Sequence, residues 1–591
     1  MPADTTVARL LRQAEVRGED AAYFVQREGR WEPTSWERYA AQVRQTARAL
    51  MAEGFEPGHA ACIIGFNRPE WVIFALGATL AGGVPAGVYT TNSAEELSYI
   101  VDHAEARFLL IEDLEQWAKV VAERDSMPKL ERVVLMEGAE VPDDPLAMGW
   151  KDFLALGDGV AEEAVDQRLE GLTLDDVGSL IYTSGTTGPP KAVMLSHGNL
   201  AWTASVAVSE LFGLGPEDSA VSYLPLSHIA EQMFTIHAAL TAGYSIYFAE
   251  SMEKVAENLR DVQPTMVFGV PRVWERMHAV VSGKLRQATG AKAKLMKWAM
   301  GVGRKVSELR CRGEEPTGWL GLQYRLATKL VFSKVKPLMG LGRARVCSSG
   351  AAPISRDVLE FFASLDIILY EVYGQSEGCG PTTFNCPGRA RLGTVGPPLP
   401  GAEVRIADDG EVLLRGPNVF LGYFKDPEAT AETLVDGWLC SGDLGAFDDD
   451  GFLSIVGRKK EILITSGGKN IAPNNLEALL KDQPIIAEAV IIGDGRKFLS
   501  ALVVLDQEAA QEVVPDGEAG ALHEDSRVLE EVERAIERVN QRVARVESVR
   551  KFRVLPQPFT VDAGELTPSL KLKRRVIYEH YSAEIESMYE D

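Results

Sequence analysis

Residues 179–193 read Ser-Leu-Ile-Tyr-Thr-Ser-Gly-Thr-Thr-Gly-Pro-Pro-Lys-Ala-Val, an apolar run that leads into a loop of glycine and hydroxyl residues. The run from Leu180 to Tyr182 predicts a buried strand. Gly185 and Gly188 lack a Cβ atom, so backbone N–H groups of the loop are able to approach anionic oxygens closely. Further donors come from Lys191 and from four hydroxyl side chains, those of Thr183, Ser184, Thr186 and Thr187. The stretch therefore predicts a loop that wraps around a phosphate chain.

This loop differs from the Walker loop, another phosphate-binding pattern. A Walker loop places four residues between its glycines and ends in Gly-Lys-Ser/Thr. Here two residues separate Gly185 from Gly188, and Lys191 precedes Ala192. Because Ser, Thr and Gly are also common in ordinary surface loops, the functional interpretation depends on other motifs in the chain.

Four further motifs follow the loop in order. They are Ser-Gly-Ala-Ala-Pro at 349–353, Tyr-Gly-Gln-Ser-Glu at 373–377, Trp-Leu-Cys-Ser-Gly-Asp at 438–443, and Gly-Arg-Lys-Lys-Glu at 457–461 with Gly-Gly-Lys at 467–469. Together with the loop they resemble the core motifs of the adenylate-forming superfamily, which includes acyl-CoA synthetases, adenylation domains and luciferases. The resemblance runs from about residue 20 to residue 580. Within the superfamily, the chain looks most like a bacterial long-chain fatty acid–CoA ligase that forms AMP.

The resemblance implies a reaction in two half-reactions. A medium- or long-chain carboxylate attacks the α-phosphorus of ATP, pyrophosphate leaves, and the thiol of coenzyme A then takes the acyl group from acyl-AMP. Such catalysis relies on positioning and charge neutralisation, because the attacking group and the phosphates are both anionic. Three alternatives stay open: an aryl- or other carboxylate–CoA ligase, an acyl-AMP ligase that loads a carrier protein, and a non-catalytic acyl-adenylate or lipid-binding relative, which would need decayed motifs.

The resemblance also assigns the nucleotide contacts. Glu377 would hold Mg²⁺ against the phosphates, since hard cations take oxygen ligands; relatives usually carry Thr before this Glu, and Ser376 keeps the hydroxyl. Asp443 would accept both ribose hydroxyls, and Arg458 would lie near the ribose and phosphates. Thr186 of the loop is expected to take part in catalysis. The adenine platform would consist of Gly350, Ala351, Tyr373 and Gly374, although a core aromatic is the other interpretation of Tyr373.

His228 lies in the run 223–231, in a loop expected to follow a strand. The resemblance implies that its imidazole, neutral or protonated, orients the reacting carboxylate; a structurally satisfied histidine is the alternative. Some long-chain synthetases carry a tryptophan four residues later that gates the fatty-acid tunnel. That position is Gln232 here, so this gate does not carry over.

Near the C-terminus, residues 564–574 resemble the terminal lysine motif of the superfamily. Many relatives read Gly-Lys, whereas Leu570 replaces the glycine here and Lys571 takes the catalytic position. The resemblance implies that this ammonium bridges the carboxylate and the α-phosphate while negative charge shifts. Lys573 is the competing assignment, because both lysines lie on one face of an extended strand.

Two half-reactions with different nucleophiles imply two arrangements of a small C-terminal domain. The predicted organisation is a large domain at 1–457, a hinge at 458–461 and a small domain at 462–591. Lys460 occupies the hinge position of the family, where few residues absorb large φ/ψ changes. Gly467 and Gly468 would border the channel for the pantetheine arm of coenzyme A.

The fold class expected from the alternation of strands and helices is α/β, with largely parallel sheets. After Gly393 short strands and turns predict a small antiparallel barrel or hairpin set, and after Gly457 a mobile α+β unit follows. In that unit, Asn474 and Glu477 form an expected capping pair. A stripe of small apolar residues, Val528, Val532, Ala535, Val539 and Val543, predicts the inward face of a long helix.

The charge balance excludes some partners. Lys and Arg number 61 against 85 acidic residues, a net charge of −24, which argues against nucleic acid. The first 15 residues lack the apolar run of a signal peptide, so a cytoplasmic location is expected. The charge-free stretch 71–94 is interpreted as a buried helix followed by a loop and strand, because glycines and Pro85 interrupt it.

Residues 281–345 reverse this balance, with 15 Lys and Arg against Glu308, Glu314 and Glu315. Apolar residues that include Trp298, Trp319 and Leu322 are interleaved with the charges. The hypothesis is that this segment makes peripheral contact with anionic membrane at the inner face, and that it also attracts the phosphates of coenzyme A. An ordinary solvated basic face is the alternative.

Overall fold

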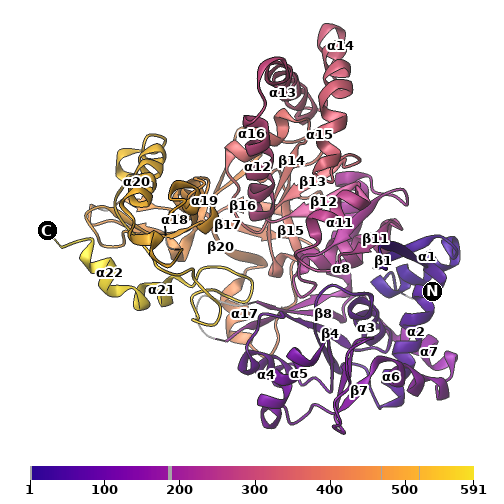
Figure 1. Ribbon diagram of the computed structural model, residues 1–591. Helices are drawn as coiled ribbons and strands as arrows, with labels where there is room; N and C mark the ends of the chain where they lie inside the picture. Colours follow the sequence, from indigo (N-terminus) through magenta and orange to yellow (C-terminus); the bar gives the residue numbers. More distant parts are fainter. Residues whose placement is uncertain (1–2, 184–188, 468, 518, 591) are drawn as a thin grey trace.

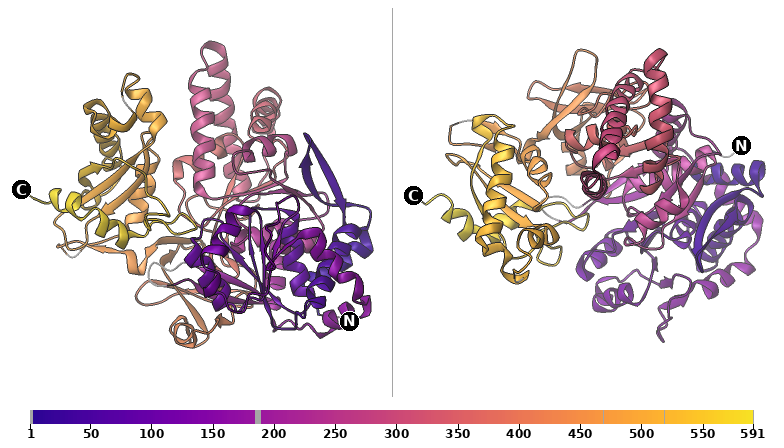
Figure 2. Two further views of the ribbon diagram at one scale, coloured as in Figure 1. Left: turned by 60° about the horizontal axis from the view of Figure 1, so that its bottom comes forward. Right: turned by 45° about the horizontal axis from the view of Figure 1, so that its top comes forward.

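The computed structural model describes residues 3–183, 189–467, 469–517 and 519–590 (Figures 1 and 2). Two eight-stranded sheets form the centre of the larger part of the molecule. The residues that flank the predicted nucleotide loop, Thr183 and Lys191, and the motif glycines Gly350 and Gly374 lie at the ends of strands in these sheets. The α/β fold class is confirmed.

The first sheet is parallel except at its two edges, where β1 pairs with β2 and β14 pairs with β15 in antiparallel register. Its strands in spatial order are β15 (Gly380–Phe384), β14 (Leu369–Gln375), β13 (Val346–Ser349), β12 (Met266–Gly269), β10 (Ser219–Ser222), β11 (Ser245–Phe248), β1 (Ala21–Arg27) and β2 (Arg30–Ser35).

The second sheet is parallel from β8 to β7 and carries an antiparallel extension formed by β9 and β18. Its order is β18 (Gly422–Tyr423), β9 (Lys191–Ser196), β8 (Val177–Thr183), β4 (Val84–Val88), β3 (Ala60–Ile64), β5 (Phe108–Ile111), β6 (Arg132–Leu135) and β7 (Ala147–Gly149). Strand β8 is the buried strand that residues 180–182 predict.

A shared core lies between the sheets and is filled largely by α2 (Trp36–Ala52) and α3 (Pro69–Leu80). Every residue of α3 after Pro69 is buried, because apolar side chains surround the whole helix rather than one face. This confirms the interpretation of stretch 71–94 as a buried helix followed by a strand, β4. Among the described residues, no helix is long and apolar enough to cross a membrane.

The other helices of the larger part cover the sheets or project from them. They are α1 (Thr6–Arg17), α4 (Ala94–His103), α5 (Leu114–Ala122), α6 (Trp150–Leu156), α7 (Glu162–Gly171), α8 (His197–Ser205), α9 (Ile229–Gln232), α10 (Ala238–Ala242), α11 (Val255–Val262), α12 (Pro271–Arg286), α13 (Gly290–Cys311), α14 (Gly318–Ala327), α15 (Ser333–Leu338), α16 (Arg356–Ser364) and α17 (Pro427–Thr433). Figure 1 shows α13 and α14 standing out at one end of the molecule.

The short strands after Gly393 form a five-stranded antiparallel sheet. Its strands are β16 (Glu403–Ile406), β17 (Glu411–Arg415), β20 (Trp438–Phe447), β19 (Leu434–Val435) and β21 (Leu453–Arg458), which pairs with β20. Within the described ranges, the hydrogen-bonded path does not close on itself, so of the two expected forms the hairpin set describes this sheet and the barrel does not.

The C-terminal unit lies to one side of the larger part (Figure 1). Its elements are β22 (Leu463–Ile464), β23 (Asn470–Ile471), α18 (Pro473–Lys481), β24 (Ile486–Ile492), β25 (Leu499–Leu505), α19 (Gln507–Val513), α20 (Ser526–Asn540), β26 (Val549–Val554), α21 (Arg574–His580) and α22 (Ser582–Ser587). The predicted apolar stripe is confirmed, since Val528, Val532, Ala535 and Val539 are fully buried in α20; Val543 lies beyond the helix end.

The capping pair expected at Asn474 is wrong. Helix α18 begins one residue earlier, at Pro473, whose fixed φ suits the first helical position. Asn474 is therefore the second helical residue, and its side chain contacts Glu461 and Arg574 instead of capping the helix.

Candidate active site

Strands β8 and β9 form the hairpin that carries the predicted phosphate loop. Thr183 ends β8 and Lys191 begins β9, and the Thr183 hydroxyl donates to the Lys191 carbonyl over 3.3 Å. The phosphate contacts predicted for the residues between Thr183 and Lys191 lie outside the described part of the chain. These residues are Ser184, Gly185, Thr186, Thr187 and Gly188. What the structure adds is the group of side chains at the base of this hairpin.

Glu377 lies at that base through a contact that sequence reasoning missed. Strand β18 pairs with β9 and places Tyr423 opposite Val193. The Tyr423 hydroxyl donates to Glu377 Oε1 over 2.7 Å, and Lys191 Nζ lies 5.0 Å from the centroid of the Tyr423 ring. Tyr423 thus holds the predicted Mg²⁺ ligand beside the predicted phosphate loop. No periodicity marks Tyr423, because its strand is only two residues long.

The predicted adenine platform lies where β13 and β14 end, the usual position of ligand sites in parallel sheets. A Cβ atom on Gly350 would come within 2.5 Å of Val372 Cγ1, and one on Gly374 within 1.8 Å of the Gly380 carbonyl oxygen. Ala351 is exposed and has a φ of +69°, a left-handed conformation that a residue with a Cβ seldom adopts. The two glycines are therefore required for packing of the backbone, and the strain at Ala351 marks the site.

Asp443 is held between two groups. Its Oδ2 accepts from the Tyr373 hydroxyl over 2.7 Å, and its Oδ1 lies 3.0 Å from Arg458 Nε. The pair forms because β20 and β21 place Asp443 directly opposite Arg458. Burial raises the pKa of Asp443, and the Arg458 charge opposes that rise. Each carboxylate oxygen still has room for another donor, so this group is able to accept hydroxyls.

The C-terminal lysine lies close to this group. Lys571 is reached by solvent, but the surrounding protein lowers the pKa of its ammonium, and Arg458 lowers it further while Asp443 and Glu377 act in the opposite sense. Leu570, before it, has a φ of +60° and is 65% exposed. The glycine of many relatives would adopt this left-handed conformation without strain.

Lys573 is placed differently from Lys571. It lies directly before α21, and its backbone N–H donates to the Glu565 carbonyl over 2.8 Å. The charges of Asp443, Arg458 and Glu377 act on Lys571, so Lys571 lies near the nucleotide motifs.

His228 belongs to the same cluster. Burial lowers its pKa to about 4, and the nearby Lys571 charge lowers it as well. Its Nδ1 accepts from the Ala230 N–H over 3.1 Å, which caps α9 and leaves the hydrogen of the neutral ring on Nε2. His228 is therefore a neutral hydrogen-bond donor. Gln232, at the position of the tryptophan gate in some relatives, is buried and donates to the Leu226 carbonyl over 2.8 Å.

The predicted hinge lies in a short 3₁₀ turn, Lys459–Glu461, between β21 and β22. Lys460 is exposed, while its neighbour Lys459 is anchored to Asp409 and Glu411 at 2.6 and 2.9 Å. Gly467 is exposed in a turn closed by the Lys469 N–H, which donates to the Thr465 hydroxyl over 3.2 Å. Gly468 lies outside the described residues.

Direct contacts hold the C-terminal unit against the larger part. The Thr91 hydroxyl donates to the Pro568 carbonyl over 2.6 Å, three residues before Lys571. Arg542 of the unit also pairs with Asp357 of the larger part at 2.9 Å. These contacts keep Lys571 in the group that also contains Asp443 and His228.

Arg574 links the lysine loop to the hinge, and sequence reasoning missed this role. Its guanidinium donates to both carboxylate oxygens of Glu477 and to the side chain of Asn474, and its Nε lies 3.8 Å from Glu461. Both partners of the Arg574–Glu477 pair are buried, with 14% and 5% of the side chains exposed. The pattern of two lysines and two arginines gave no signal, because it resembles an exposed basic run.

Replacing Arg574 with methionine is expected to destabilise the C-terminal unit by about 3 to 5 kcal/mol, because Glu477 would stay buried without its partner. Hydrogen exchange of the amides in α18 and β24 measures this local unfolding. Arg575→Met is the matched control, since Arg575 is 77% exposed and pairs with Glu579 at the surface; it should change little. Equal amide protection in the Arg574 and Arg575 variants would contradict this role of the Arg574–Glu477 pair.

Glu231, one turn after His228, is a buried carboxyl that sequence reasoning also missed. Burial raises its pKa to about 7, against hydrogen bonds from Thr235 and Ser222. The two hydroxyls lie 2.7 and 2.8 Å from Oε1. Since the folded pKa exceeds the unfolded one, the stability that this group contributes is full below about pH 4.5 and is lost as pH rises through about 7.

Glu231→Gln is expected to remove this pH dependence, since glutamine resembles the protonated acid. At pH 4 the thermal midpoints of the variant and the wild type should agree, whereas at pH 8 the variant should unfold at higher temperature. Glu308→Gln, at an exposed position, is the control. If the thermal midpoints of the variant and the wild type differ by the same amount at both pH values, Glu231 is not the group whose raised pKa causes the pH dependence.

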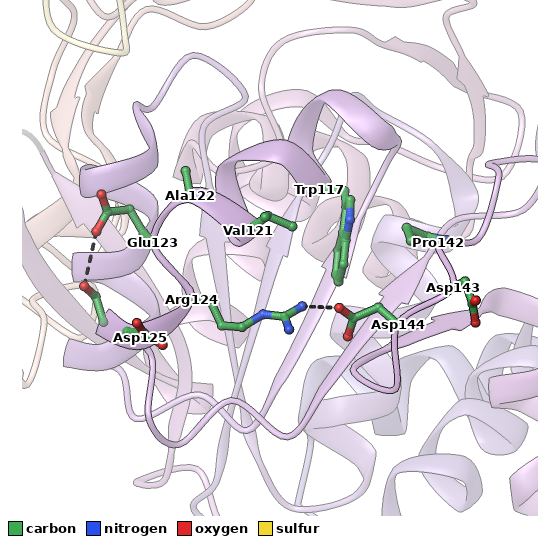
Figure 3. Close-up of a pocket in the computed structure, with 10 residues that line it drawn as sticks. Trp117, Val121, Ala122, Glu123, Arg124, Asp125, Pro142, Asp143 and Asp144 are labelled. Carbon is green, nitrogen blue, oxygen red and sulfur yellow. Dashed lines mark hydrogen bonds and ion pairs between the residues drawn. The ribbon is translucent and has the colours of Figure 1, made fainter.

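A surface cavity lies apart from this cluster. It has a volume of about 470 Å³ and is lined by the end of α5 and the loops that follow, including Trp117, Arg124 and Asp144 (Figure 3). Arg124 and Asp144 pair at 2.5 Å across it. None of the motif residues lines this cavity, so it is not part of the candidate active site.

Comparison with known proteins gives the family. The AMP-binding enzyme family matches residues 10–424, and the AMP-binding enzyme C-terminal domain matches residues 460–591. The chain is 37% identical over 624 residues to long-chain-fatty-acid–CoA ligase ACSBG2 of Xenopus laevis, covering 99% of this chain and 84% of that protein. It is 35% identical over 625 residues to ACSBG1 of Homo sapiens, covering 99% and 85%.

Solved structures show the same fold. The A domain of carboxylic acid reductase from Segniliparus rugosus, in complex with AMP and a co-purified carboxylic acid, superimposes with a TM-score of 0.76 at 20% identity over 99% of this chain and 94% of that chain. ATP-bound MatB from Rhodopseudomonas palustris superimposes with a TM-score of 0.70 at 23% identity over 98% and 99%. The chain therefore belongs to the AMP-binding, adenylate-forming enzyme family, and long-chain-fatty-acid–CoA ligases are among its relatives.

Proposed function

We propose that this protein converts medium- or long-chain fatty acids to acyl-CoA, with acyl-AMP as the intermediate and AMP and pyrophosphate as products. The observation that carries the proposal is the cluster of Lys571, His228, Asp443, Arg458 and Glu377, which come from distant motifs. The substrate class comes from the names of the curated relatives.

In the first half-reaction, the fatty-acid carboxylate attacks the α-phosphorus of ATP. Asp443 accepts the ribose hydroxyls and fixes the nucleotide against the strand ends. The neutral His228 donates its Nε2 hydrogen to the carboxylate and orients it without adding charge. The Lys571 ammonium lies between the reacting anions and stabilises the charge that develops on the α-phosphate.

The residues present fit a Mg²⁺ ion held mainly by phosphate oxygens. Mg²⁺ takes one or two carboxylates together with phosphates and waters, and Glu377 has one oxygen that accepts from Tyr423 and a second that accepts from none of the described residues. Within the described ranges, no cluster of three or more metal-ligating side chains exists, as is usual where ATP supplies most ligands. When bound, the ion would neutralise phosphate charge.

The second half-reaction needs the C-terminal unit, residues 462–591, to turn about residues 458–461 relative to the domain at 1–457. In the present arrangement Lys571 lies in the cluster, which suits adenylation. We propose that rotation at Lys460 removes Lys571 and brings Gly467 and Gly468 to the thiol channel. We also propose that the enzyme works in the cytoplasm, in peripheral contact with anionic membrane through residues 281–345.

An assay for AMP and thioester separates the proposal from its alternatives. The purified protein with ATP and Mg²⁺ is offered a panel from octanoate to oleate together with benzoate, with either coenzyme A or a carrier protein as acceptor. Acyl-CoA formation that is highest with the longer fatty acids supports the proposal. Preference for benzoate, or transfer only to the carrier protein, would support the alternatives, and no AMP with any acid would overturn it.

A further inference from the structure

The projecting helices α13 and α14 leave an apolar stripe exposed. The inner face of α14 and the following turn packs on α13 through Leu320, Tyr324, Ala327 and Val331. The outer face carries large apolar side chains with high exposure: Trp319 72%, Leu322 47%, Leu326 45% and Leu330 42%. Positions 319, 322 and 326 follow helical spacing, so these side chains share one side of α14. Figures 1 and 2 show these helices standing clear of the sheets.

Basic side chains accompany this stripe. Arg325 follows Leu322 by three residues and Lys329 follows Leu326 by three, so on the helix surface each base neighbours a leucine of the stripe. In segment 281–345, ion pairs of the described residues involve only Arg310, Lys336 and Arg345. The exposed bases without an ion pair are Lys284, Lys292, Lys294, Lys297, Arg304, Lys305, Arg312, Arg325, Lys329, Lys334 and Arg343.

This combination selects the occupant of the surface. An exposed stripe of this kind in a single chain marks an interaction site. A second copy of this protein that docked through the same face would bring its own lysines and arginines against these lysines and arginines. An anionic surface instead complements their charge. Nucleic acid would be attracted by the lysines and arginines, but its phosphate backbone would not bury the exposed leucines. Tryptophan and leucine beside lysine and arginine are the composition of helices that lie in the headgroup region of a bilayer.

We propose that the outer face of α14 and the turn that follows it docks on anionic lipid, with Trp319, Leu322, Leu326 and Leu330 in the headgroup region and the neighbouring bases on the lipid phosphates. The rest of the chain, with its net charge of −24, is repelled by such a surface, so the molecule docks with this end only. The proposal rests on the proposed function in one respect: docking places the enzyme where free fatty acid partitions.

Vesicle flotation tests the docking without any substrate. The protein is mixed with vesicles of phosphatidylcholine alone or with a third of phosphatidylglycerol, at low and at high salt. Binding is expected only to the anionic vesicles, and it should weaken more than tenfold at high salt. Equal binding to both vesicles, or none to either, would overturn the proposal.

Two variants test the residues. Trp319→Ser with Leu322→Ser and Leu326→Ser should reduce binding more than tenfold, whereas Val16→Ser, Leu114→Ser and Leu174→Ser, which replace exposed apolar residues elsewhere, should not. The double variant Lys329→Glu with Lys334→Glu should also reduce vesicle binding more than tenfold. The double variant Lys151→Glu with Lys497→Glu, which changes the net charge equally at exposed positions elsewhere, is the control. If the controls lose binding equally, net charge and not this surface governs docking.

Quenching by brominated lipid shows whether Trp319 enters the bilayer. Tryptophan fluorescence should fall on binding, and the part of that fall that Trp319→Phe removes belongs to this residue. Light scattering decides the competing occupant, since a dimer that the Trp319 triple variant dissociates would replace the lipid proposal with self-association. Octanoate activation in the absence of vesicles should be the same in both variants as in the wild type. If the wild-type protein does not activate octanoate or any other acid, the proposed function is overturned and the docking proposal is not.

Discussion

Replacing Lys571 with alanine is expected to slow acyl-AMP formation by about 10²- to 10³-fold, because the ammonium that stabilises the developing charge on the α-phosphate is lost. Lys571 lies within the field of Asp443, Glu377 and Arg458 in the present arrangement. Thioester formation from supplied acyl-AMP should change little, since the phosphate charge is then being released. The two half-reactions are measured separately, by pyrophosphate release and by acyl-CoA formation.

Lys573→Ala is the control for this prediction, because Lys573 lies two residues away at the start of α21 and carries the same charge. It should leave adenylation within a few-fold of the wild type. If Lys573→Ala abolishes adenylation and Lys571→Ala does not, the assignment of the catalytic lysine is reversed. An equal loss of both half-reactions in Lys571→Ala would contradict the account of two arrangements.

Lys460→Pro is expected to keep adenylation and to reduce thioester formation by at least about tenfold, because proline fixes φ near −65° at the pivot. Lys460 lies in a 3₁₀ turn, whose φ values are close to that of proline. The substitution therefore fits the arrangement in which Lys571 lies in the cluster and opposes rotation away from it. Single-turnover measurement of each half-reaction reports the two rates independently.

Lys460→Ala removes the charge and leaves φ free, so it serves as the matched control. Both of its half-reactions should remain near those of the wild type. If the proline variant performs both half-reactions normally, Lys460 is not the pivot, and if it loses adenylation first, the 3₁₀ turn does not represent the adenylating arrangement.

Several features of the fold follow from local pattern. Helix α3 and strand β8 lie where the apolar runs after residue 70 and at 180–182 predict them, because a continuous apolar run has few alternatives to burial. The inward stripe of α20 follows from its helical spacing. Asn474 was misplaced because a capping pattern does not reveal that Pro473 is able to start the helix itself.

Some residues of the candidate site are named by sequence motifs, and others are recognised only from tertiary contacts. The motifs name Glu377, Asp443 and Arg458, and the register of β20 with β21 makes the last two partners. Tyr423 and Arg574 had no signal, because their roles depend on contacts with residues far away in the chain. The sequence also left Lys571 and Lys573 as alternatives, and only the packing of the C-terminal unit distinguishes their surroundings.

The amino-acid sequence by itself determined the glycine and hydroxyl composition of the predicted phosphate loop, the order of the motifs, and the reversal of charge in segment 281–345. Tertiary structure decided which groups meet and which faces stay open. It placed Lys571 near His228, buried Glu231, and turned Trp319 and Leu322 outward while Leu320 and Tyr324 packed on α13. The physical reason is that composition and periodicity act over a few residues, whereas burial and charge pairing depend on segments that only folding brings together.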